Sequence, residues 1–474
     1  MEYDKILTVL KRFKFEEKMK IACYWSRETM TLDGVDSESI AKGKPSPWEL
    51  ETFLLFSIKA EEWKGDTFNV RDDKVFRDIV SCIRNEVPTL LKDSHGAELI
   101  KWLFITAASV QFEIQEFYFF KLYRYFFYFS FKNDVVDMSR YFKDFFGCEY
   151  RDFLVLGYLL WQLSATKDNN KELLSAILNH FRCAADNLVL SREKYVEMLD
   201  SFAEKPLDYL HCVRPSYQYP FISYNENVFL PLPHLIPRAT TTSLMYRLTS
   251  NDIHLLEIIG KEVYETYLKE ILAESGIFDE VIPEQIYKKN LRTLDVMARK
   301  GDHYIFFDSK SYRPKATLRV FSQDALEHDT ERLAQAFEQV YIHLRTKFLR
   351  DYCYFDEVPN VLPDSIFGLV VVQENPFIPC DDIYKKAANR LRIDTNSEEY
   401  EWLCSHIGIT SINSVEQYCF TRTDMRHILD DVSTRKDTPY DWLCGDTNPT
   451  ETYEPYIQFK DYMLKEIEHT LKSL

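Results

Sequence analysis

The chain has 474 residues, 46% of them hydrophobic and 28% charged, which is an ordinary globular composition with room for two or three domains. Its net charge of −17 excludes a general attraction to nucleic acid, so any polyanion site has to be a local basic patch. The 12 glycines form neither GxGxxG nor GxxxxGK[ST], and the 10 cysteines form no CxxC pair. These absences argue against dinucleotide and P-loop sites, zinc ribbons and disulfide scaffolds.

Residues 1–213 are predicted to form a helical domain, because apolar residues recur there at helical spacing while Gly and Pro are rare. The most hydrophobic stretch, Phe112 to Phe131, is interrupted by charged residues, and the N-terminal segment also mixes charges with its apolar residues. We therefore expect no membrane span, no secretory signal and a cytoplasmic protein with reduced thiols. The aromatic rings between Phe112 and Phe146 fall all round the helix, which is typical of a buried bundle element rather than a base-stacking surface.

Composition also predicts the remaining domain boundaries. Five prolines between Arg214 and Thr242 forbid regular helix, so residues 214–249 are predicted to be a Pro-rich connecting region. Residues 250–379 alternate helix, strand, strand, helix, strand, which is the order of an α/β domain, and residues 380–474 are predicted to be a helical C-terminal region. The expected fold class is a multidomain α+β and α/β protein, with a large helical N-terminal domain and a central α/β/α core around a mixed sheet.

The stretch from Leu291 to Lys310 predicts a β-hairpin. Two strand-like runs flank Gly301 and Asp302, and Gly accepts the positive φ at the first position of a two-residue type II′ turn. Pairing of Lys300 with His303 fixes the register of every other pair along the hairpin.

This register places Asp295 directly opposite Asp308, and Lys310 on the same face two residues further along. Cβ atoms of opposed residues lie about 4.5–5.5 Å apart, so the two carboxylates repel one another unless something compensates. Mg²⁺ commonly takes one or two protein carboxylates and leaves its other positions to water and phosphate oxygens. The ammonium of Lys310 cannot ligate a metal, but it can neutralise charge on a phosphate or orient a water.

The order of an acidic helix, an Asp, a hairpin to Asp-x-Lys and a further helix resembles the PD-(D/E)XK nuclease superfamily over residues 250–379. The resemblance implies a restriction-endonuclease-like core in which Asp295 and Asp308 bind Mg²⁺, with Mn²⁺ as a substitute. It further implies a ligand from the backbone carbonyl of Ser309 and makes Lys310 the catalytic lysine. This sequence departs from the family pattern because Asp308 stands where Glu is common and no Pro precedes Asp295.

Family members often add a glutamate from the preceding helix within a G-x-x-x-E pattern. GKEVYETYLKEIL, starting at Gly260, offers Glu265 at that spacing as a further catalytic and metal-binding residue, with Glu262 as the alternative. Gln335 and Gln339 on the following helix lack the QxxxY spacing of RecB-like members, so neither is assigned a role.

The hairpin also lies in the most basic part of the chain. The stretch from Ile286 to Arg319 contains nine basic residues and only three acidic ones, two of which are the predicted metal ligands. Affinity for nucleic acid comes mainly from neutralising backbone phosphates, so this window predicts the nucleic-acid contacts. The residues chosen for that role are Lys288, Lys289, Arg292, Arg299, Arg313 and Lys315.

The sequence thus predicts a Mg²⁺-dependent phosphodiesterase, with an endonuclease and a DNA substrate favoured. Its large helical extension resembles those of bacterial restriction or phage-defence effectors. The helical domain is available to bind a protein partner or a second copy of the chain. The alternative is a non-catalytic nucleic-acid-binding or scaffold protein that retains the fold.

Overall fold

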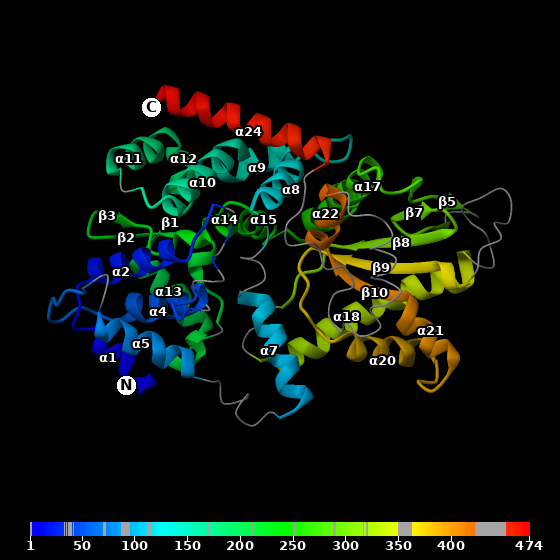
Figure 1. Ribbon diagram of the computed structural model, residues 1–474, viewed down its shortest axis with the longest axis horizontal. Helices are drawn as coiled ribbons and strands as arrows, with labels where there is room; N and C mark the ends of the chain where they lie inside the picture. The colour runs from blue at the N-terminus through cyan, green and yellow to red at the C-terminus, as the bar shows by residue number, and fades with distance from the viewer. Residues whose placement is uncertain are drawn as a thin grey trace. The chain divides into compact units, whose positions relative to one another are not determined.

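The computed structural model describes most of the chain, and every structural statement below concerns those residues. They are 2–32, 34, 36, 40, 42–69, 73–86, 95–110, 116, 118–168, 170–210, 212–250, 252–287, 291–315, 317–318, 321–348, 363–421 and 452–474. The chain divides into two compact units (Figure 1). Unit 1 comprises Met1–Asn251 and Asp461–Leu474, and unit 2 comprises Asp252–Lys460. No helix in the described ranges is long and apolar enough to cross a membrane.

Unit 1 is mainly helical, as predicted for residues 1–213. Two of its helices are buried on most sides. All ten residues of α4 from Glu49 to Ile58 are buried, and α8 buries most of its aromatic rings. The helices are α1 (Ile6–Leu10), α2 (Phe15–Glu28), α4 (Pro47–Lys59), α5 (Lys74–Asn85), α7 (Ala97–Val110), α8 (Tyr118–Ser130), α9 (Met138–Phe146), α10 (Tyr150–Ala165), α11 (Lys171–His180), α12 (Arg182–Asp186), α13 (Arg192–Phe202), α14 (Ile236–Ala239), α15 (Thr242–Thr249) and, from Asp461 on, α24 (Glu454–Ser473).

Residues 214–249 differ from the predicted connecting region because they are an integral part of unit 1. They contribute β2 (Phe221–Tyr224) and β3 (Asn227–Phe229), which form a three-stranded sheet with β1 (Val189–Ser191). The prolines do keep the segment from forming one long helix, as expected. Its apolar residues nevertheless pack into the helical core, where Leu232, Leu235 and Ile236 are buried.

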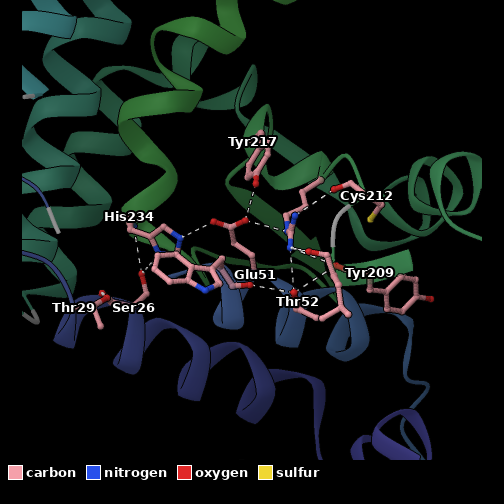
Figure 2. Close-up of polar contacts among 11 residues, drawn as sticks. Ser26, Thr29, Glu51, Thr52, Tyr209, Cys212, Tyr217 and His234 are labelled. Carbon is pink, nitrogen blue, oxygen red and sulfur yellow. Dashed lines mark hydrogen bonds and ion pairs between the residues drawn. The ribbon is translucent and has the colours of Figure 1, made fainter. Parts of the chain in front are cut away.

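A buried polar network ties this segment to the helices (Figure 2). Glu51 on α4 accepts a hydrogen bond from the Tyr217 hydroxyl at 2.8 Å and lies 3.0 Å from Nε of Arg214, and both charged side chains are fully buried. His234 Nε2 lies 3.4 Å from the other Glu51 oxygen. Burial opposes ionisation of Glu51, but Arg214, His234 and Tyr217 outweigh it and lower the pKa of Glu51 below its usual value. Through Arg214, Tyr217 and His234 the network attaches residues 214–249 to α4.

Unit 2 is built around a five-stranded mixed sheet in the order β10-β9-β8-β7-β4. Strands β4, β7 and β8 are antiparallel neighbours, whereas β8, β9 and β10 run parallel. The strands are β4 (Glu280–Pro283), β7 (Val296–Lys300), β8 (His303–Lys310), β9 (Ile366–Val372) and β10 (Ile407–Ser411), and a separate two-stranded sheet pairs β5 (Ile286–Tyr287) with β6 (Leu291–Arg292).

Helices cover both faces of the five-stranded sheet. Figure 1 shows α17 and α22 on one face and α18 and α20 on the other. Gly368 in β9 permits close packing against α18, because a Cβ there would lie 2.3 Å from Cγ1 of Val340. The helices are α16 (Ile253–Ile258), α17 (Glu265–Glu274), α18 (Gln323–Ile342), α20 (Cys380–Leu391), α21 (Glu398–His406) and α22 (Ile412–Thr421), with π-helical turns at Ile259–Tyr264 and His343–Phe348.

The mixed α/β class predicted for residues 250–379 is confirmed, but β4 and β10, the two edge strands of the five-stranded sheet, were missed. The helical prediction for residues 380–474 is wrong at β10, which pairs with β9 and completes the sheet. Its short run IGITS was assigned to the helix before it, because five residues carry too little periodicity to separate strand from helix. Strand β4 was missed for the same reason, since Glu280–Pro283 is short and ends in Pro.

Candidate active site at the end of the β7–β8 hairpin

The β7–β8 hairpin has the register that the sequence predicts. Lys300 pairs with His303, and the ladder continues to Val296 opposite Phe307. Gly301 has a φ of 56°, the left-handed value expected at the first turn position. Asp295 and Asp308 are the next opposed positions along this ladder, so both acids lie at its far end.

Asp295, Asp308 and Lys310 come together at this end of the sheet. Lys310 Nζ lies 2.8 Å from Oδ2 of Asp308, and the Ser309 N–H donates a 2.7 Å hydrogen bond to Oδ2 of Asp295. The N–H and C=O of one strand residue point toward the same neighbouring strand. The Ser309 carbonyl therefore faces the side on which Asp295 lies, and its role as a ligand stays a prediction.

Glu265 joins this cluster from the first turn of α17. It forms a 2.6 Å ion pair with Lys261 on the preceding π-helical turn, and its charge acts on both Asp295 and Asp308. Of the two predicted glutamates, Glu265 is therefore the one next to the aspartates. π-Helical turns often occur at functional sites, and this one brings Lys261 and Glu265 to the same edge.

Burial raises the pKa of all three carboxyl groups in the cluster. Burial, together with the charges of Asp308 and Glu265, raises the pKa of Asp295 well above its usual value. Burial also raises the pKa of Asp308 and of Glu265, although Lys310 and Lys261 oppose the shift. Burial disfavours the charged form of Lys310, but Asp308, Asp295 and Glu265 outweigh it and raise the pKa of Lys310.

Asp295→Asn is expected to raise the melting temperature at pH 8 in the presence of EDTA. The raised pKa means that the folded wild type binds more protons than the unfolded chain, so its stability falls as the pH rises through that pKa. Asparagine removes this cost, and each gain of about 1 kcal/mol adds about 2–4 °C in a unit of this size. The advantage should shrink as the pH approaches 4, where the carboxyl of the wild type is protonated.

The control for this measurement is Asp302→Asn at the exposed hairpin turn. A surface change of this kind is expected to alter stability by less than about 0.5 kcal/mol at either pH. A wild type that is more stable than Asp295→Asn by the same amount at pH 4 and pH 8 would contradict the raised pKa of Asp295.

Some of the basic side chains predicted to bind nucleic acid are already paired with carboxylates. Arg292 pairs with Glu284 at 2.7 Å and Arg299 with Glu280 at 3.0 Å, and both glutamates lie just outside the counted window. The backbone N–H of Lys315 donates to Asp329. Arg313 also belongs to the described residues. Lys288 and Lys289 lie outside the described residues, as does Arg319.

The chemistry of the donor set fits one hard divalent cation. Asp295 and Asp308 supply carboxylate oxygens, and burial, joined at Asp295 by the charges of Asp308 and Glu265, raises both pKa values, so a bound cation would offset the cost of ionising them. In the described part of the chain, however, no group of three or more His, Cys, Asp or Glu side chains is arranged to hold a metal. Asp295 and Asp308 are thus the two carboxylates that could hold such an ion, and Glu265 is paired with Lys261.

Three residues near the cluster were missed by sequence reasoning. Gln339 on α18 accepts a 3.0 Å hydrogen bond from Lys310 Nζ, and Lys261 bridges Glu265 and Glu284. Gln339 was assigned no role because the QxxxY spacing is lacking. Its place on the helix that follows the hairpin could have marked it as a candidate. No sequence signal marked Lys261 or Glu284, because their meeting depends on the packing of α17 against β4.

A second constellation, in unit 1, has the order of a hydrolase triad. Ser26 Oγ lies 2.8 Å from Nδ1 of His234, whose Nε2 faces Glu51 (Figure 2). All three side chains are fully buried, and Ser26 Oγ also accepts the backbone N–H of His234. A nucleophile must be reached by its substrate, so we interpret this group as part of the structural network of unit 1.

Comparisons of the chain with protein-family models, curated proteins and solved structures found no match. The nuclease resemblance therefore stays a hypothesis that depends on the hairpin and the side chains gathered at its end.

Proposed function

We propose that unit 2 is a Mg²⁺-dependent phosphodiesterase that cleaves nucleic acid, with DNA as the favoured substrate. The observation that carries the proposal is the ion pair of Lys310 with Asp308 at the end of the β7–β8 ladder, where the neighbouring Ser309 N–H holds Asp295 and the charge of Asp308 acts on Asp295. Two crowded carboxylates beside a lysine match the needs of phosphodiester hydrolysis: a cation site and a neighbouring positive charge.

In this mechanism Asp295 and Asp308 would hold the ion, with the Ser309 carbonyl as a further oxygen donor. When bound, Mg²⁺ would polarise the phosphodiester and lower the pKa of a coordinated water. The N–H of Ser309 orients Asp295 through its 2.7 Å hydrogen bond. This bond keeps one Asp295 oxygen fixed while the other is available to a ligand.

Lys310 acts as a charge stabiliser rather than as a base. Its raised pKa keeps the ammonium protonated at neutral pH, so it cannot accept a proton from water. Gln339 and Asp308 hold Nζ from two sides, which places the positive charge beside the ion position. From there the ammonium offsets negative charge that develops on the phosphate, and it donates a hydrogen bond that orients the attacking water.

A cleavage assay on the purified chain tests the proposal. End-labelled single- and double-stranded DNA and RNA are incubated with Mg²⁺, with Mn²⁺ or with EDTA. We expect shorter products only in the presence of a divalent ion. Binding that survives EDTA without any product would favour the alternative, a scaffold that holds nucleic acid through its basic residues. The wider role as a restriction or phage-defence effector would then lose its basis.

A further inference from the structure

Lys261 occupies the centre of a second charged group beside the proposed metal site. Its Nζ lies 2.6 Å from Oε2 of Glu265 and 3.0 Å from Oε2 of Glu284, so one ammonium joins two carboxylates from different elements. Arg292 contacts the same Glu284 oxygen at 2.7 Å. The charge of Lys261 also acts on Asp308 and is itself influenced by Asp295, which makes both groups part of one electrostatic cluster.

The position of Lys261 is where a second divalent ion would find its ligands. An ion in that position would use the other oxygens of Glu265 and Glu284, because Lys261 already joins these two carboxylates and its charge acts on Asp308. Both are already neutralised by nitrogen donors. A fixed ammonium carries one charge instead of two and leaves no open coordination position.

We propose that the Lys261 ammonium takes the place of a second divalent ion, so that each chain binds one ion, at Asp295 and Asp308. The inference rests on the proposed function and deepens it from metal dependence to metal stoichiometry. Lys261 is then a positioning residue: it holds Glu265 in place without touching the ion or the substrate.

Mn²⁺ binding to the full chain, without nucleic acid, tests this inference. Free Mn²⁺ is followed by electron paramagnetic resonance during titration, which counts bound ions independently of activity. Lys261→Gln removes the ammonium, Lys261→Arg keeps the charge, and Lys269→Gln on α17 is the matched control. We expect one ion for the wild type, Lys261→Arg and Lys269→Gln, and two ions for Lys261→Gln. Circular dichroism verifies that each variant is folded.

The possible outcomes distinguish a failure of the role proposed for Lys261 from a failure of the proposed metal-dependent nuclease function. Two ions on the wild type would overturn the role of Lys261 and leave a metal-dependent nuclease standing. One ion on folded Lys261→Gln would also overturn it, since an emptied site should fill. No ion on any of the four proteins would remove the proposed function together with the inference. A Lys261→Gln chain that does not fold moves the decision to Lys261→Arg, where a second ion would contradict the proposal.

Discussion

Asp308→Asn is expected to lower Mg²⁺-dependent cleavage by at least about 10³-fold, equivalent to about 4 kcal/mol of transition-state stabilisation. Asparagine keeps the shape of the side chain but removes the charge that would hold the ion and fix Lys310. The variant should remain folded, because Asp308 is buried with its pKa raised, so its charge costs stability. Initial rates on labelled DNA at saturating Mg²⁺ provide the measurement.

Two further variants are measured beside Asp308→Asn, one expected to lose activity and one expected to keep it. Lys310→Met should lose activity to a similar degree, since it removes the ammonium that Asp308 and Gln339 hold. Asp302→Asn, at the exposed turn of the same hairpin, should cleave like the wild type. If Asp308→Asn cuts DNA at the wild-type rate and still depends on Mg²⁺, the proposed mechanism is wrong.

Glu51→Ala is expected to destabilise unit 1 by about 3–5 kcal/mol, the usual cost of leaving a buried charge without its partner. Arg214 is fully buried and would lose the carboxylate 3.0 Å from its Nε. Tyr217 and His234 would lose their shared acceptor as well. Urea titration, followed by hydrogen exchange of peptides from α2 and α4, measures the effect on unit 1 separately from unit 2.

The control is Asp200→Ala, which breaks an ion pair with Lys59 on the same helix, α4. That pair is partly exposed to solvent, so its loss should cost no more than about 1 kcal/mol. Equal effects of Glu51→Ala and Asp200→Ala would mean that the buried network does not hold unit 1 together.

The features that the sequence predicted correctly are determined by residues close to one another along the chain. The turn at Gly301, the register of β7 and β8 and the meeting of Asp308 with Lys310 all follow from a short loop and the alternation of side chains. None of them requires knowledge of distant packing. The alternation of helix and strand between residues 250 and 379 was predictable for the same reason.

The features that the sequence did not predict depend on contacts between distant segments. Gln339 reaches Lys310 only because α18 packs on the sheet, and Lys261 reaches Glu284 only because α17 lies against β4. Arg214 lies in a stretch that its prolines marked as a connection, but its partner Glu51 is 163 positions earlier in the chain. Periodicity and spacing carry no information about such pairs.

The central claim is that one divalent ion is held between Asp295 and Asp308. Anomalous diffraction from a crystal soaked in Mn²⁺ tests it most directly. We predict one strong peak with oxygens of both aspartates at about 2.1 Å, the distance typical of small octahedral cations. A crystal saturated with Mn²⁺ that has no peak between these two carboxylates would contradict the claim.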